Sequence, residues 1–131
     1  NLSPSPLLEH FFGQVPKGTA LDIGSGNGWD SIFLSSKRFQ VTAIDTKKSN
    51  IDNLAHIAKE NNLSIKAELI DVRKFRFHPD TYEIIITMNS LFFLNGDDFK
   101  TIVENIKKSL KPGGIAIISS FTIYDSLFQK L

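Results

Sequence analysis

Three glycines at alternate positions follow a short apolar segment near the start of the chain. Residues 19–23 are mostly apolar and favour a buried strand, and Gly24, Gly26 and Gly28 come directly after it. Since glycine has no Cβ, such a turn can reach positive φ and let a ligand lie against bare backbone. A helix that begins at Trp29 would aim its free N–H groups into the turn. This stretch is therefore predicted to open a nucleotide-type binding site.

The spacing of the glycines separates the classes of nucleotide site. A dinucleotide fingerprint that starts at Gly24 needs its third glycine at position 29, where the chain has Trp29. A P-loop needs Lys-Ser or Lys-Thr after the turn, and neither pair follows it, which excludes that class. A nicotinamide-dependent oxidoreductase is disfavoured by Trp29, and a cofactor titration would test it.

Two aspartates stand at the ends of the next two predicted strands. Asp45 follows the apolar residues 40–44, and Asp71 follows residues 65–70. In cofactor-binding βαβ folds, a carboxylate at the position of Asp45 accepts hydrogen bonds from ribose hydroxyls. The alternatives are a helix-capping role for Asp45 and a solvated strand end for Asp71. Because neighbouring parallel strands end at one edge of a sheet, both carboxylates and the glycine turn can line one elongated groove.

Apolar periodicity predicts an α/β fold with a doubly wound, mostly parallel sheet and helices on both faces. The leading helix either covers the sheet or closes its aromatic side chains over the ligand. A turn at Pro112-Gly113-Gly114 is expected to end the last helix. The strands are predicted over residues 19–23, 40–44, 65–70, 82–87 and 115–121, and the helices over 7–12, 29–38, 48–61 and 99–110.

Composition indicates an ordinary globular protein of one domain. The chain has 131 residues, a net charge of +1, 41% hydrophobic residues and no cysteine. This charge favours neither nucleic acid nor a membrane as a partner. A chain without cysteine fits a reducing cytoplasm, which is the expected location, and excludes disulfides and thiolate chemistry. The three histidines lack the spacing of metal ligands, so no metal site is expected.

The glycine segment resembles motif I of the class I S-adenosylmethionine-dependent methyltransferases. The match runs over Asp22-Ile23-Gly24-Ser25-Gly26-Asn27-Gly28. Asp45 is similar to the acidic residue of motif II, and Asp71-Val72 is similar to motif III. Residues 110–114 look like the turn that precedes the fifth strand in these enzymes. Within the class, residues 26–31 and 89–94 resemble the tellurite-resistance methyltransferases and their small-substrate relatives.

The resemblance implies S-adenosylmethionine as the cofactor and the sheet order 3-2-1-4-5. It implies that Asp22 organises the turn and the amino group of the cofactor and that Asp45 binds the ribose. It also implies that Asp71 accepts a hydrogen bond from the adenine amine, with the backbone of Val72 as a second partner of the base. The implied function is in-line methyl transfer to a small-molecule acceptor; the alternative is a module that binds the cofactor or its product without catalysis. The expected cofactor-binding residues are Asp22, Gly24, Ser25, Gly26, Gly28, Asp45, Thr46, Asp71, Val72 and Met88.

The class fold has two further strands, after the five predicted here. Residues 1–131 are therefore expected to form a single domain that is incomplete at its C-terminal end. Acceptor-binding residues of the resembling group lie in the missing part, so no catalytic residue is named. His10 or Tyr124 could reach the mouth of the groove as a base, but each is interpreted as structural. The fifth strand, without its usual neighbour, is expected to offer an edge for self-association.

Overall fold

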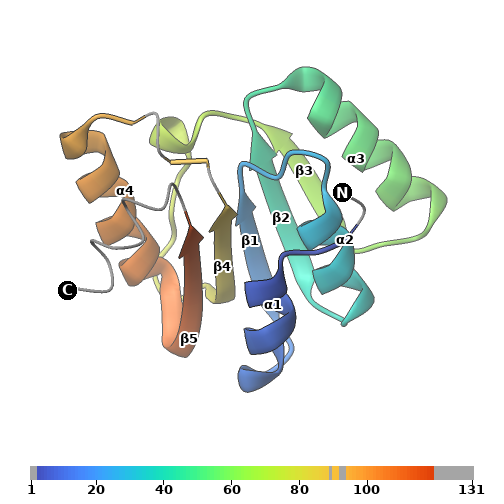
Figure 1. Ribbon diagram of the computed structural model, residues 1–131, viewed down its shortest axis with the longest axis horizontal. Coiled ribbons are helices and arrows are strands. Elements are labelled where there is room, and N and C mark those ends of the chain that lie inside the picture. The colour runs from blue at the N-terminus through green and yellow to red at the C-terminus, as the bar shows by residue number, and fades with distance from the viewer. Residues whose placement is uncertain (1–2, 89, 92–93, 120–131) are drawn as a thin grey trace.

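A parallel sheet of five strands forms the centre of the protein, as the computed structural model shows (Figure 1). The structure describes residues 3–88, 90–91 and 94–119. The strand order is β3-β2-β1-β4-β5, and each neighbouring pair is parallel, which confirms the predicted order and fold class. The strands are β1 (Thr19–Ile23), β2 (Gln40–Asp45), β3 (Ile65–Leu69), β4 (Tyr82–Met88) and β5 (Leu110–Ser119).

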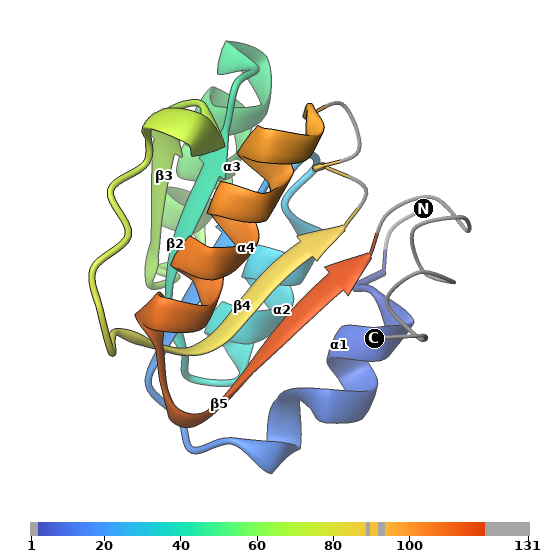
Figure 2. The same ribbon diagram turned by 90° about the vertical axis from the view of Figure 1, so that its left-hand side faces the viewer.

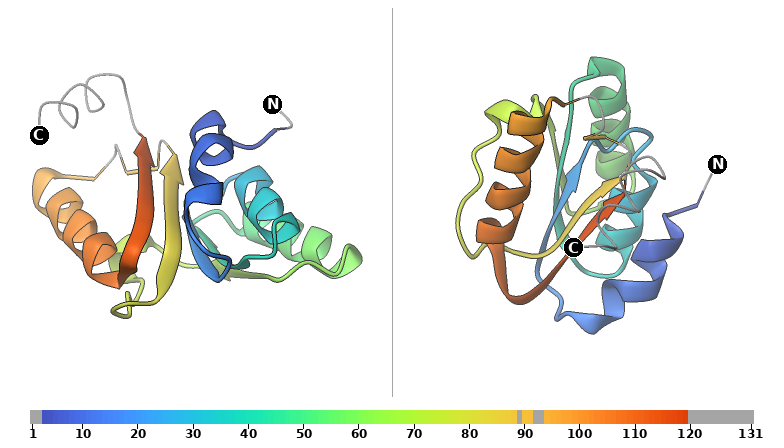
Figure 3. Two further views of the ribbon diagram at one scale, coloured as in Figure 1. Left: turned by 90° about the horizontal axis from the view of Figure 1, so that it is seen from below. Right: turned by 60° about the vertical axis from the view of Figure 1, so that its left-hand side comes forward.

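Helices cover both faces of this sheet. The helices α1, α2 and α3 lie on one face and α4 lies on the other, as the view from below shows (Figure 3). The helices are α1 (Pro6–Phe11), α2 (Trp29–Ser36), α3 (Lys48–Glu60) and α4 (Gly96–Ser109), with short 3-10 turns η1 (Phe12–Gln14) and η2 (Val72–Lys74). In the described part of the chain, no helix is long and apolar enough to span a bilayer.

Alternating side chains of the strands build a separate core on each face. On one face, Ala20 and Ile84 pack with Leu8 of α1 and Leu34 of α2. Successive strand residues point to opposite faces, so Leu21 and Ile85 pack on the other side with α4 residues such as Ile106. The run of Ile84, Ile85 and Ile86 is fully covered, because β4 is flanked by strands and buried on both faces.

The fifth strand begins earlier than predicted. Leu110 was assigned to the helix and residues 112–114 to a turn, yet β5 already starts at Leu110, which pairs with Tyr82 (Figure 2). Pro112 favours an extended residue before it, and a register shift between Tyr82 and Ile84 accommodates the glycines that follow. The predicted end of the strand at Phe121 lies outside the described residues.

An ion pair between a buried carboxylate and an exposed lysine joins strands at the amino-terminal end of the sheet. Glu83 of β4 accepts hydrogen bonds from the backbone N–H of Thr19, at 2.6 Å, and from the Lys111 ammonium, at 2.7 Å. Burial raises the pKa of the Glu83 carboxyl, but hydrogen bonds from Lys111 and Thr19 outweigh it, so the pKa lies below its ordinary value. These bonds join β1, β4 and β5 at the end of the sheet opposite the glycine turn.

The glycine turn packs so tightly at two of its three glycines that neither has room for a Cβ. A Cβ on Gly24 would lie 2.3 Å from the Cβ of Ser90, which follows β4. A Cβ on Gly28 would lie 2.6 Å from a methyl carbon of Leu54 on α3. Both glycines also have positive φ, +69° and +85°, which side chains with a Cβ rarely adopt.

A Gly28→Ala variant should be less stable than wild type by about 2 kcal/mol, because it combines a left-handed backbone with a clash against Leu54. Urea denaturation measures the difference. Gly13→Ala is the matched control, since a Cβ at Gly13 has no atom within 4 Å. Equal stability of the two variants would show that the turn and α3 are not packed as described.

Candidate functional site

The carboxyl ends of four strands meet around two hollows, one on each side of the glycine turn. The first has a volume of about 220 Å³ and is lined by Ile23, Gly24, Ile44, Asp45, Thr46, Ile70, Asp71, Val72, Met88 and Ser90. The second has a volume of about 270 Å³ and is lined by Ser3, Ser5, Asp22, Gly24, Ser25, Gly26, Asn27, Trp29, Asp30 and Met88. Because Gly24 and Met88 line both, the hollows are adjoining parts of one groove.

Nine of the ten residues predicted to bind a cofactor line this groove. The exception is Gly28, which lies outside both hollows and serves the packing against Leu54. Gly26 differs from its neighbours, because a Cβ there would meet nothing closer than the Gly24 carbonyl oxygen at 4.0 Å. Among the described residues other than its two chain neighbours, therefore, no side chain lies within 4 Å of this position, and the space beside Gly26 is open to a ligand.

Asp45 joins the end of β2 to the glycine turn. Its Oδ2 atom accepts a 2.8 Å hydrogen bond from the Gly26 N–H, and its Oδ1 atom accepts one of 2.8 Å from the Lys47 N–H. The N-cap position of α3 is Lys47, without a side-chain cap bond, so Asp45 is not the N-cap residue of that helix. The carboxylate lines the first hollow, where ribose hydroxyls would find an acceptor.

Asp22 is a buried carboxyl group at the end of β1. Its side chain accepts a 2.7 Å hydrogen bond from the Ser31 hydroxyl of α2, and only 3% of the residue is exposed. Burial raises the pKa of Asp22 to about 7, although the Ser31 bond opposes the shift. Asp22 and Asp30 make the second hollow acidic, which suits a ligand with a cationic amino group.

One residue that lines the second hollow has a buried polar atom without a partner among the described residues. The Ser25 hydroxyl is buried, and no described residue makes a hydrogen bond to it. Buried polar groups in proteins are nearly always satisfied, so an orphaned hydroxyl beside a cavity indicates a polar ligand. This hydroxyl, the open side of Gly26 and the two carboxylates together fit the amino-acid part of S-adenosylmethionine.

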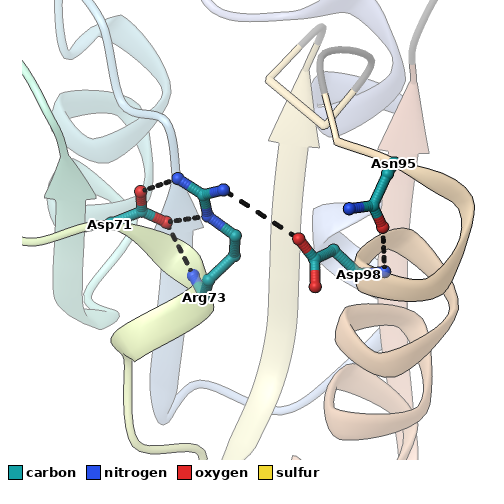
Figure 4. Close-up of polar contacts among 4 residues, drawn as sticks. All are labelled: Asp71, Arg73, Asn95 and Asp98. Carbon is teal, nitrogen blue, oxygen red and sulfur yellow. Dashed lines mark hydrogen bonds and ion pairs between the residues drawn. The ribbon is translucent and has the colours of Figure 1, made fainter.

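Asp71 lies at the far end of the first hollow, directly before η2. Arg73 donates three hydrogen bonds to its carboxylate, from the backbone N, Nε and Nη2 atoms, at 2.9, 3.0 and 2.6 Å (Figure 4). These bonds lower the pKa of Asp71 to about 2. Asp71 stays partly exposed, so a solvated strand end remains an alternative to a ligand-binding role, but its carboxylate is paired with Arg73, which the sequence prediction did not include.

The sequence prediction also missed the residues that close the second hollow. Ser5 donates from its backbone N and its hydroxyl to Asp30, at 2.7 and 2.8 Å, and so holds the segment before α1 against α2. Phe11 and Phe12 of the leading helix pack on the core instead of the ligand groove. His10 stacks on Phe11 and lines neither hollow, and Tyr124 lies outside the described residues.

Comparison with known proteins places the chain in a family. The family model described as tellurite resistance protein TehB matches residues 12–126. The chain belongs to the TehB family. It is 30% identical over 98 residues to TehB of Haemophilus influenzae, named as a probable S-adenosyl-L-methionine-dependent methyltransferase, and this match covers 75% of the chain and 34% of that protein. The solved structure of that TehB has a TM-score of 0.74 at 27% identity, covering 86% of this chain and 38% of the other.

This TehB-family chain also resembles a second group of enzymes. It is 31% identical over 114 residues to the ubiquinone biosynthesis O-methyltransferase of Rickettsia akari. This match covers 87% of the chain and 44% of the relative. The chain thus spans less than half the length of the curated relatives that it matches. The matched part contains the glycine turn and both strand-end aspartates, and with them the whole groove apart from Ser3 and Ser5 at its edge.

The raised pKa of Asp22 predicts an unusual pH dependence of stability. A carboxyl whose pKa is raised on folding binds more protons in the native state, so the free energy of unfolding falls as pH rises from about 4 to about 7. Asp22→Asn keeps an acceptor for Ser31 and removes the loss of stability that ionisation of the buried carboxyl group causes. The variant should equal wild type near pH 4 and exceed it by about 2–4 kcal/mol at pH 8.

Urea denaturation at a series of pH values measures this difference. Asp80→Asn, on an exposed turn, controls for the loss of one carboxylate from the whole chain. A difference between Asp22→Asn and wild type that is the same at pH 4 and pH 8 would contradict the prediction.

Proposed function

We propose that the chain binds S-adenosylmethionine along the groove and takes part in methyl transfer to a small-molecule acceptor. The observation that carries the proposal is the continuous groove on both sides of the glycine turn, with open space at Gly26 and an unpartnered Ser25 hydroxyl. Family membership supports it, because two of its relatives are named as methyltransferases.

Each hollow has its own part in this proposal. The first has apolar walls from Ile44, Ile70 and Val72, which suit a purine, and the Asp45 carboxylate, which suits the ribose hydroxyls. The second has Asp22 and Asp30, which suit the ammonium of the methionine part. Met88 lies where the hollows adjoin, next to the expected position of the sulfur.

The cofactor, when bound, supplies a methyl group already activated on a sulfonium. The task of the chain is then to fix its position and orientation, which accounts for much of the rate in such displacements. In this proposal the cofactor lies against the backbone of Gly26, and its ammonium group makes an ionic contact with Asp22. Its ribose hydroxyls donate hydrogen bonds to Asp45. A base is required only for an acceptor that arrives protonated.

Calorimetry should detect binding of S-adenosylmethionine and S-adenosylhomocysteine with micromolar affinity, roughly −8 kcal/mol at about 1 μM. Asp45→Ala should weaken this binding by about 1.5–3 kcal/mol, because a charged acceptor for two hydroxyls is lost. Asp52→Ala is the matched control, since Asp52 lies on the exposed side of α3.

A second variant examines the backbone contact. A Cβ at Gly26 has room among the described residues, but it would stand in the ligand space on a left-handed backbone with φ of +55°. Gly26→Ala should therefore weaken cofactor binding more than tenfold, and thermal unfolding checks that the strained variant is folded. Binding of NAD without binding of either sulfur ligand would overturn the proposed function, and normal affinity in Gly26→Ala would remove the turn from the site.

Transfer of a radiolabelled methyl group is the test of the reaction itself. A hydroxylated aromatic compound and tellurite are suitable acceptors to test, since one relative is named as an O-methyltransferase of ubiquinone biosynthesis and the family is named for tellurite resistance. The expected result is methyl transfer to one of these acceptors, at a lower rate in Asp45→Ala than in wild type. Tight cofactor binding without transfer to any small acceptor would favour the alternative of a non-catalytic binding module.

Self-association along β5, the outer strand of the described sheet, stays a prediction, which light scattering can test.

A further inference from the structure

Arg73 lies beside the groove without lining it, and its half-exposed side chain makes an ion pair with Asp71. The two residues before it, Asp71 and Val72, line the first hollow, whereas Arg73 does not. The guanidinium contacts both oxygens of the Asp71 carboxylate, with Nε donating to Oδ1 and Nη2 donating to Oδ2 (Figure 4). Such a two-point contact fixes the plane of the carboxylate, which a single ammonium cannot do.

The remaining hydrogen-bonding capacity of Asp71 is limited. A carboxylate has about four acceptor positions, and Arg73 uses two on Oδ1 and one on Oδ2. One acceptor position on Oδ2 is left for a ligand. The guanidinium therefore determines the direction in which Asp71 can accept a hydrogen bond.

A second carboxylate steadies Arg73 from outside. Its Nη1 atom lies 3.9 Å from Asp98 Oδ2, in the first turn of α4. The Asp98 backbone is itself fixed, because Asn95 caps α4 and accepts a 2.8 Å bond from the Asp98 N–H (Figure 4). At 3.9 Å this contact is weaker than the bonds to Asp71, so its contribution is secondary.

We propose that Arg73 is a positioning residue that aims the free acceptor of Asp71 at the exocyclic amine of the cofactor's adenine. The inference rests on the proposed cofactor site and adds a source of base specificity within it. Preorganisation matters here, since a carboxylate free to rotate would have to be ordered when the ligand binds. Arg73 thus favours a purine with an amine donor at this position over one without it.

The experiment compares S-adenosylhomocysteine with its 6-deamino analogue, in which hydrogen replaces the amine, by calorimetry on the full chain. Wild type should prefer the adenine ligand by about tenfold or more. Asp71→Ala should abolish this preference, and Arg73→Met should reduce it to about threefold or less. Arg73→Lys keeps the charge but lacks the fork, so its preference should fall between those of wild type and Arg73→Met.

Two controls separate base recognition from general damage. Arg76→Met removes an arginine from the same connection, where it lines a different hollow, and should keep the wild-type preference. Asp98→Asn should lose only a small part of the preference for the adenine ligand. Thermal unfolding confirms that each variant is folded. In the double variant Asp71→Ala/Arg73→Met, the preference should not fall below that of Asp71→Ala alone, as expected for two residues that act through one contact.

The outcomes distinguish this inference from the proposed function. Failure of wild type to bind either ligand would overturn both. Binding with an unchanged preference in Arg73→Met, or in Asp71→Ala, would overturn the inference alone and leave the cofactor site in place. A loss of affinity for both ligands by the same factor in Arg73→Met would also overturn it, because that result describes a structural role.

Discussion

The backbone of the glycine turn passes between two side chains that leave no room for a Cβ. Ser90, after β4, fills the space beside Gly24, and Leu54 of α3 fills the space beside Gly28. The Ser90 hydroxyl also donates to the Ile23 carbonyl at 2.9 Å, which joins the ends of β1 and β4. The outer glycines thus set the position of the turn against the protein, and Gly26 between them keeps its open side for a ligand.

The two ends of the groove hold carboxyl groups in different protonation states near neutral pH. Burial keeps Asp22 close to half-protonated, whereas Arg73 keeps Asp71 ionised. A cationic ligand group near Asp22 would favour its ionised form, so binding there is linked to proton release. At Asp71, whose pKa lies well below neutral pH, no such proton release is expected on binding.

The sheet order and most of the groove residues were predicted through the resemblance to the methyltransferases, and the meeting of Asp45 and Asp71 in one hollow was predicted from the strand pattern. The strand pattern is informative because apolar periodicity marks strands, and neighbouring parallel strands end at one edge of the sheet. The pairing of Ser5 with Asp30 spans 25 residues and leaves no local pattern, so it could not be predicted. Arg73 is only two residues from Asp71, but its rotamer depends on the surrounding fold. The early start of β5 was missed because pairing with Tyr82 overrode the turn signal of the proline and glycines.

Glu83, with its bonds to Thr19 and Lys111, lies at the opposite end of the same strands from the groove. The residues of this network line neither hollow, so the two sets of contacts share no partner. Substitutions at distant sites without shared partners usually have additive effects. Substitutions that alter ligand preference at the groove are therefore expected to leave the Glu83 contacts in place. The stability that these contacts contribute would then be unchanged while the ligand-binding end of the sheet varies.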